Sequence, residues 1–486
     1  MSRAGTLLAA LALALAAAPA ASRAQAPADA AAWRAVQPKP AGAITFRSPR
    51  VQKLKLQNGI PVWLVERHGL PLLTVTAIVR AGSERSTAQT AGLPNLVNRM
   101  LVEGTTTRGP IAIAEESDAL GARLGRYTGM DVSLVAMDIL AEALDASLDL
   151  FADVVLRPAF APPELERVRH ELLADVLQLK DEPARMSVQL AETVLYGPQH
   201  PYGMPIRGTE SSLKRLARAD VAAFYQAHYV APNAMLLVVG DTTPQAILAK
   251  LEARFGAWPG GTPQPVTLPQ PPAVAGPVIY LLDRPRAPQA FVRFAALGLA
   301  RRDPAFEVGE LANEVFGGAF SSRLNMNLRE QQGYTYGAHA YLVGRRTPGP
   351  FTGGAAVKTA VTADAIRELL AELDGMRTRP PTAAELDEAR GRMLLSLAGH
   401  FETTGRTART LDTLMVHGFA PTYYDGLGAR LRRLGPKAIA RFAPRLYDAR
   451  RLVFAVIGPR RELEADLAKV GTVTVVDQAT LDRLFP

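Results

Sequence analysis

Residues 213 to 241 read LKRLARADVAAFYQAHYVAPNAMLLVVGD, and residues 431 to 459 read LRRLGPKAIARFAPRLYDARRLVFAVIGP. Both stretches have the pattern of a helix, a turn and a buried strand, and they align without a gap. Identical residues recur at a constant offset: Leu213, Arg215, Leu216, Phe224, Tyr229 and Gly240 fall on Leu431, Arg433, Leu434, Phe442, Tyr447 and Gly458. The sequence therefore predicts a tandem duplication.

One break in composition separates the two copies. Residues 259–277, PGGTPQPVTLPQPPAVAGP, are dominated by Pro and Gly and lack hydrophobic periodicity, which is typical of an extended linker. We expect a first domain over residues 46–258 and a second over 278–486.

Each half mixes runs typical of strands with amphipathic helices. Strands are predicted at 70–82, 234–241, 277–283 and 451–458, and helices at 162–186 and 382–403, each opened by Pro or a capping residue. The predicted fold class is α+β, with two homologous tandem halves, each an antiparallel sheet packed against helices.

The N-terminus resembles a secretory signal. Arg3 precedes the apolar run LLAALALALAAAPAA, and small residues suited to cleavage follow at 18–20 or 24–26. We expect a signal peptide over residues 1–26 and an extension over 27–45; an uncleaved anchor is the alternative. The chain has no cysteine, which suits an exported, oxidising compartment. These features predict a periplasmic protein with no integral span after cleavage.

The charge of the chain gives little support to nucleic-acid binding. The net charge is +9, but the basic residues are scattered along the sequence rather than gathered in patches interleaved with aromatic residues. We therefore expect no nucleic-acid partner.

The stretch GLPNLVNRMLVEGT, residues 92–105, predicts a helix with one buried stripe. Leu93, Leu96, Val97, Met100 and Leu101 recur at helical spacing. Asn95, Asn98 and Arg99 share the other side, where positions 95 and 99 lie one turn apart. That spacing is the one a zinc peptidase uses for two His ligands and a Glu base.

At this point the sequence resembles the pitrilysin/insulinase family of metallopeptidases, which includes the mitochondrial processing peptidase and paired bacterial periplasmic subunits. The frame around the family's HxxEH motif survives as Gly92, Met100, Gly104 and Thr105. Three further segments resemble the family: residues 55–83, 195–209 and 316–342. The resemblance implies a clamshell of two halves around a central cleft.

The resemblance also locates the zinc ligands, and they are replaced. Asn95 and Arg99 stand at the two His positions, Asn98 at the catalytic Glu position, and Asp175 where the family has its distal Glu. A guanidinium stays protonated and repels a cation, so we expect no metal bound by this chain. A solvated helix face is the alternative interpretation of these residues.

No other zinc motif is evident. The His residues, at 68, 170, 200, 228, 339, 400 and 417, include no HxxEH or HExxH pattern, and each is interpreted as structural or exposed. Activity of the chain alone through Asp175 and other ligands is the least favoured possibility.

The second half retains a different pair. Within FGGAFSSRLNMNLREQQGYTYGAHAYL, Arg329 and Tyr336 match the family's Arg/Tyr pair, which in that family orients the peptide and stabilises the oxyanion. A helix-end Arg with surface ion pairs and a strand Tyr packed on the core is the alternative. The resemblance further implies that an edge strand pairs with extended substrate, and we expect it within residues 128–140.

These inferences combine into one hypothesis. The chain is predicted to be the non-metal subunit of a periplasmic zinc endopeptidase, with Arg329 and Tyr336 completing a site whose Zn is held by a homologous HxxEH subunit in a heterodimer or larger assembly. The alternative is a noncatalytic peptide-binding or scaffold protein of the cell envelope.

Overall fold

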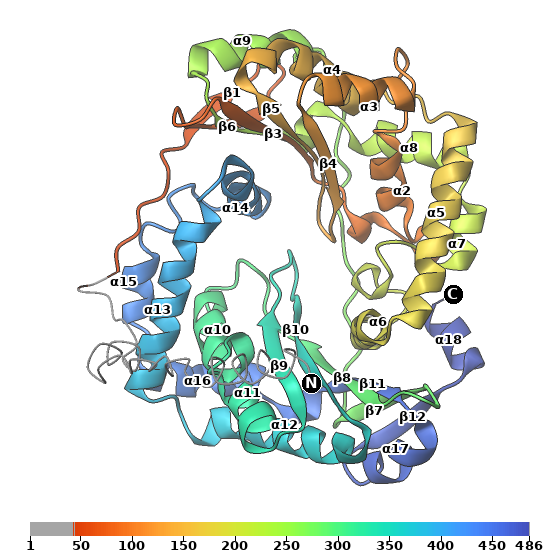
Figure 1. Cartoon of the computed structure of the whole chain (residues 1–486), viewed down its shortest axis with the longest axis vertical. Coiled ribbons are helices and arrows are strands. Elements are labelled where there is room, and N and C mark those ends of the chain that lie inside the picture. Colours follow the sequence, from red (N-terminus) through yellow and green to blue (C-terminus); the bar gives the residue numbers. More distant parts are fainter. Residues whose placement is uncertain (1–41, 43, 486) are drawn as a thin grey trace, which may run out of the picture. The chain divides into compact units, whose positions relative to one another are not determined.

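Two six-stranded sheets, one in each half of the chain, organise the fold (Figure 1). The first has the order β1-β2-β6-β3-β5-β4 and the second β12-β7-β11-β8-β10-β9. The strands of the first are β1 (Gln52–Lys55), β2 (Pro61–Glu66), β3 (Leu72–Val79), β4 (Arg123–Thr128), β5 (Ser133–Leu140) and β6 (Ala234–Gly240). Those of the second are β7 (Val278–Asp283), β8 (Gln289–Leu297), β9 (Thr335–Leu342), β10 (Pro350–Lys358), β11 (Val453–Gly458) and β12 (Thr472–Val476).

The structure, a computed structural model, describes residues 42 and 44–485. The predicted signal peptide, and the predicted extension apart from residues 42, 44 and 45, lie outside the described residues. The chain divides into residues 1–44 and 45–486, and every helix and strand named here belongs to the second unit. Among the described residues, no helix is both long and apolar enough to cross a membrane.

The predicted duplication is confirmed in the geometry of the two halves. The stretches quoted above form α8 (Arg218–His228) before β6, and α16 (Pro436–Leu446) before β11. The paired aromatic residues are all buried, Tyr229 and Tyr447 most completely. At the end of β6, Gly240 has φ of 146°, and a Cβ there would lie 2.2 Å from the carbonyl oxygen of Leu72. Glycine is therefore required where the strand leaves the sheet.

The sheets are mostly antiparallel, as predicted, with a parallel margin in each. β2 runs parallel to β6, and β7 runs parallel to both β11 and β12. These pairs are distant in sequence and are joined through helices, which is how parallel strands are connected.

Helices from the same half cover one face of the first sheet. Its largest cluster of buried residues joins the sheet to α2, α4, α5, α8 and α9. The helices of this half are α2 (Leu93–Met100), α3 (Pro110–Ala119), α4 (Leu144–Leu156), α5 (Pro162–Asp181), α6 (Pro183–Tyr196), α7 (Glu210–Arg215), α8 and α9 (Pro244–Phe255). The predicted helix 162–186 is divided between α5 and α6, because Pro183 has no N–H to continue the first helix.

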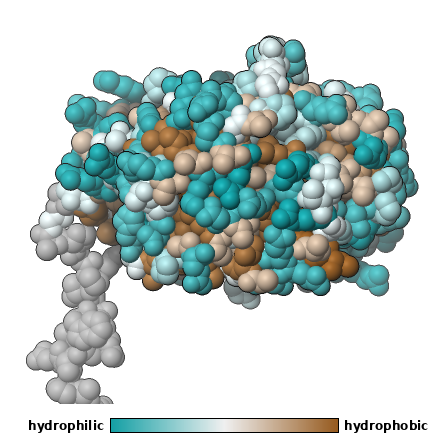
Figure 2. Space-filling model, turned by 90° about the horizontal axis from the view of Figure 1, so that it is seen from above, coloured by the Kyte–Doolittle hydropathy of each residue, from teal (hydrophilic) through white to brown (hydrophobic). Residues whose placement is uncertain are grey.

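The second half has a matching set of helices. They are α10 (Phe306–Asn313), α11 (Arg323–Asn325), α12 (Thr362–Thr378), α13 (Ala383–His400), α14 (Thr404–Val416), α15 (Leu427–Arg432), α16, α17 (Arg460–Leu467) and α18 (Gln478–Leu484), with π-helical turns at Glu314–Gly318 and Met326–Gln331. Towards the side of α9 and α4, hydrophilic residues cover much of the surface and hydrophobic residues lie between them in small groups (Figure 2).

Each half also covers the sheet of the other. Helix α14 of the second half packs on β3 and β6 of the first sheet, where Leu411 and Leu414 join Trp63, Leu237 and Val239 in one buried cluster (Figure 1). Helix α6 of the first half packs in the same way on β8 and β11 of the second sheet. We call this arrangement the reciprocal helix exchange. It makes the two halves one folding unit, because neither sheet has both faces covered by its own half.

Polar contacts reinforce the seam between the halves. The guanidinium of Arg345 pairs with Glu192 at 2.7 Å, and the backbone N–H of Arg346 donates to the carboxylate of Asp131 at 2.9 Å. The side chain of Arg346 lies 3.6 Å from Glu84, which is only 3% exposed. Burial outweighs the attraction of Arg346 and raises the pKa of Glu84 to about 7.

The buried carboxyl of Glu84 predicts a pH dependence of stability. Its folded-state pKa lies above the unfolded value of about 4.5, so the folded state holds the proton more tightly, and stability is lost as the pH rises from about 4.5 to 7. We expect Glu84→Gln to remove this component, on the order of 3 kcal/mol at most. Urea unfolding of both proteins at pH 5 and pH 8 measures it. If the wild-type protein and Glu84→Gln lost the same free energy of unfolding between pH 5 and pH 8, Glu84 would not titrate in this range.

Candidate functional site

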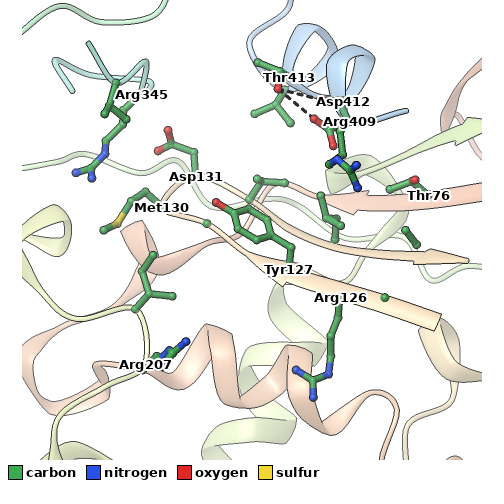
Figure 3. Close-up of a pocket in the computed structure, with 18 of the residues that line it drawn as sticks. Thr76, Arg126, Tyr127, Met130, Asp131, Arg207, Arg345, Arg409, Asp412 and Thr413 are labelled. Atoms are coloured by element: carbon green, nitrogen blue, oxygen red, sulfur yellow. Dashed lines mark hydrogen bonds between the residues drawn. The ribbon is translucent and has the colours of Figure 1, made fainter. Parts of the chain in front are cut away.

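A cavity of about 1110 Å³ lies beside the first sheet and is lined by residues from both halves (Figure 3). The first half contributes β4, β5, parts of α5 and α6, and the loop at 205–208. The second half contributes residues 343–345 after β9, and α14. The two halves therefore line an open cavity large enough for several peptide residues.

The free edge of the first sheet inside this cavity is β4. The prediction that residues 128–140 supply the edge strand is wrong, because the strand within them is β5 (Ser133–Leu140), which lies between β3 and β4. The two strands form a hairpin whose turn is closed by the N–H of Gly129 donating to the carbonyl of Val132 at 2.8 Å. The Thr128-Gly129 pair between two alternating runs was the available signal for this turn.

The structure brings two of the four degenerate metal positions into direct contact. Arg99 on α2 donates to the carboxylate of Asp175 on α5 at 2.9 Å, and it lies 3.8 Å from Glu171. Arg207 also approaches Asp175, at 3.8 Å. The guanidinium of Arg99 thus lies beside the carboxylate that would bind a metal. It balances the charge of Asp175, so no metal ion is needed there.

The other two positions are withdrawn from solvent, although only Asn98 forms hydrogen bonds through its side-chain nitrogen. Asn98 is 2% exposed and donates from its amide nitrogen to the carbonyl of Tyr127 and the hydroxyl of Thr128, both at 3.0 Å. Asn95, one turn earlier, is half-buried. The interpretation of this helix side as a solvated face is wrong, because β4 and α5 cover it.

The residues present do not suit a metal ion. Within the part of the chain that the structure describes, no group of three or more His, Cys, Asp or Glu side chains is placed to hold one. His68 contacts Asp241 at 2.7 Å, and this hydrogen bond raises the pKa of His68. Burial instead lowers the pKa of His228 to about 4. Among the described residues, neither histidine belongs to a group that could hold a metal ion.

Arg329 and Tyr336 lie close together in sequence but outside the cavity lining. Arg329 stacks over the ring of Phe320, with 4.4 Å between the guanidinium carbon and the ring centroid, and lies 3.5 Å from Glu330. Tyr336 is on β9, the edge strand of the second sheet, and is 90% exposed. The alternative of a core-packed tyrosine is therefore wrong, and the hydroxyl of Tyr336 is accessible to an external ligand.

The cavity also contains residues whose position there was not predicted from the sequence. Arg126 and Tyr127 project to opposite sides of β4, and Arg409 and Asp412 come from α14 (Figure 3). Burial raises the pKa of Asp412 to about 7. No local signal marks these residues, because the reciprocal helix exchange is what brings α14 to β4.

Comparison with known proteins gives a consistent assignment. Residues 63–209 match the family model "Insulinase (Peptidase family M16)", and residues 215–393 match "Peptidase M16 inactive domain". An uncharacterized zinc protease of Rickettsia felis is 26% identical over 298 residues, which are 61% of this chain and 71% of that protein. One of Streptomyces coelicolor is 23% identical over 421 residues, 85% of this chain and 91% of that protein.

Solved structures show the same fold. A peptidase M16 inactive domain from Pseudomonas fluorescens superposes with a TM-score of 0.79 at 26% identity, covering 84% of this chain and 98% of that one. A protease from Helicobacter pylori has a TM-score of 0.78 at 17% identity, covering 85% and 100%, and shows the likeness of fold alone. From the two family models and the conserved architecture of both halves, the chain belongs to the insulinase family of peptidases, M16.

Proposed function

We propose that this chain is the non-metal subunit of a zinc endopeptidase that acts on extended peptides. A homologous partner with an intact HxxEH motif would hold the zinc, and this chain would supply Arg329 and Tyr336. The membership of the M16 family and the match to its inactive-domain model support a role beside an active subunit.

One observation carries the proposal: the ion pair between Arg99 and Asp175. It occupies the degenerate zinc position, with a 2.9 Å contact, so the chain needs another protein for metal-dependent hydrolysis. At the same time Tyr336 is almost fully exposed on an edge strand. An exposed phenol is available to donate a hydrogen bond to a carbonyl oxygen as it gains negative charge, and the Arg329 guanidinium can hold the peptide backbone beside it.

The proposed compartment is the periplasm. Its support comes from the sequence: an N-terminal region that resembles a cleavable signal, and the lack of cysteine.

A second candidate is a noncatalytic peptide-binding or scaffold protein of the envelope. The observation that favours it is the position of Arg329 and Tyr336 outside the cavity lining, whereas the cavity itself contains a free strand edge. In this case peptides would be bound along β4 without hydrolysis.

The deciding experiment is a zinc measurement on the native assembly. The protein is purified by a tag from its own host, the co-purifying chains are identified, and zinc is quantified. We expect about one zinc for each pair, together with a second chain that carries HxxEH. An assembly with no zinc and no such chain would exclude the split peptidase and leave the binding function.

A further inference from the structure

The edge of β4 has unpaired backbone groups inside the cavity. Hydrogen-bonded pairs alternate along an antiparallel ladder, and Gly129 bonds to Val132 at its closed end. The same alternation, counted back from Gly129 in steps of two, means that the backbone groups of Tyr127, Gly125 and Arg123 bond to β5. The N–H and C=O groups of Leu124 and Arg126 therefore face the free edge, where an extended peptide can pair with them.

The two faces of β4 offer different surroundings to such a peptide. Leu124 packs against the core of the first half, and Thr128 accepts from Asn98 of α2, so these alternate residues lie on the α2 face. Arg126 shares that face by the same alternation, and Figure 3 shows it on the same side of the strand as Arg207. Tyr127 lies on the opposite face, towards α14.

Several arginines gather on the α2 face, and the carboxylates there are already paired with arginines other than Arg126. Arg99 and Arg207 share the carboxylate of Asp175, and Glu171 is divided between Arg99 and Arg167. Arg126 forms no hydrogen bond or ion pair with any residue that the structure describes, although its side chain lines the cavity. Burial and the nearby Arg99 lower the pKa of Arg126, and the charges of Glu103 and Glu171 offset this only in part.

We propose that Arg126, with Arg207 on the same side of the strand, binds a carboxylate of an extended peptide paired to β4, so that the site selects an acidic side chain opposite Arg126. This inference rests on the peptide-binding part of the proposed function and holds whether or not the peptide is cleaved. A paired peptide residue opposite Arg126 projects to the same face as Arg126. A guanidinium binds a carboxylate through two parallel hydrogen bonds, and the surrounding arginines repel Lys and Arg side chains.

The test is peptide binding to the full mature chain, without a partner, by fluorescence anisotropy. The probes are labelled peptides of about seven residues, acetylated and amidated, because β4 spans 6 residues. One carries a central Glu and its match carries Gln; a third has Gln and a free C-terminal carboxylate. We expect the Glu peptide to bind about tenfold more tightly than the Gln peptide, as for a charged hydrogen-bonded pair.

Arg126→Gln should reduce that ratio to near one while leaving the Gln peptide's affinity unchanged. The matched control is Arg123→Gln, since Arg123 is on the same strand, lines the cavity and forms no ion pair among the described residues, but lies on the opposite face. It should keep the preference for Glu. Circular dichroism checks that both variants are folded.

Each other outcome overturns the inference. These are equal binding of the Glu and Gln peptides, a preference that survives Arg126→Gln, a preference lost equally in Arg123→Gln, and no binding by any peptide. Tighter binding of only the third peptide would assign the carboxylate to a chain end and overturn the side-chain selection. None of these results depends on zinc or a partner, so they are separate from the test of the split peptidase.

Discussion

Replacement of Tyr336 by Phe is expected to lower kcat of the assembled peptidase by about 100-fold, with little change in KM. The variant keeps the ring and loses only the hydroxyl that we assign to the oxyanion, and removal of one such donor costs roughly 3 kcal/mol of transition-state stabilisation. The measurement is steady-state cleavage of a quenched fluorescent peptide by the reconstituted pair. The side chain is 90% exposed, so the fold should be unaffected.

The matched control for this variant is Tyr341→Phe. Tyr341 is on the same strand, β9, and is 51% exposed, but it lies five residues further along, beyond the register shift between Thr335 and Ala338. It should leave kcat unchanged. An unchanged rate in Tyr336→Phe and in Arg329→Ala would remove the Arg/Tyr pair from the mechanism, and equal losses in both tyrosine variants would point to the strand rather than to one hydroxyl.

Replacement of Leu411 by Ala is expected to destabilise the whole chain by about 3 to 4 kcal/mol. Leu411 is on α14 and fully buried against the first sheet, and loss of a buried leucine leaves a cavity that the surroundings only partly fill. Because α14 belongs to the second half and its partners to the first, both halves should unfold in one transition. Urea unfolding followed by circular dichroism and by tryptophan fluorescence measures this, since Trp63 lies in the same cluster.

Leu395→Ala on the adjacent helix α13 serves as the control. Leu395 is 56% exposed, and a surface substitution of this kind changes stability by about 0.5 kcal/mol or less. Two separated transitions in Leu411→Ala, or a loss as small as that of the control, would contradict the view that the exchanged helix holds the first sheet together.

The sequence predicted the repeated architecture because the two copies retain the same buried positions. Phe224 and Phe442 stand at equivalent places in α8 and α16, and hydrophobic periodicity within one helix or strand is a local property. The degenerate zinc frame was also local, since residues 95 and 99 lie one turn apart. The relation of these positions to Asp175, by contrast, was expected only from the family resemblance and not from the spacing.

What the sequence missed depends on contacts between distant segments. The edge strand was assigned to β5 instead of β4, the preceding strand of the same hairpin. Alternation of apolar residues indicates a strand, but it does not show whether that strand has a neighbour on one side or on both. Arg126 and Asp412 are separated by most of the chain and face one cavity only because α14 crosses to the first sheet. Neither residue has a sequence context that distinguishes it from ordinary surface.

The reciprocal helix exchange also bears on the biosynthesis of the chain. The first sheet is complete once β6 has been made, at residue 240, but α14 ends only at residue 416. In the interval the nascent protein exposes the buried side chains of Trp63, Met235 and Leu237 to solvent. Exposed apolar surface of this kind is bound by chaperones and promotes aggregation. Successful folding of the first half thus waits until about two-thirds of the second half has been synthesised.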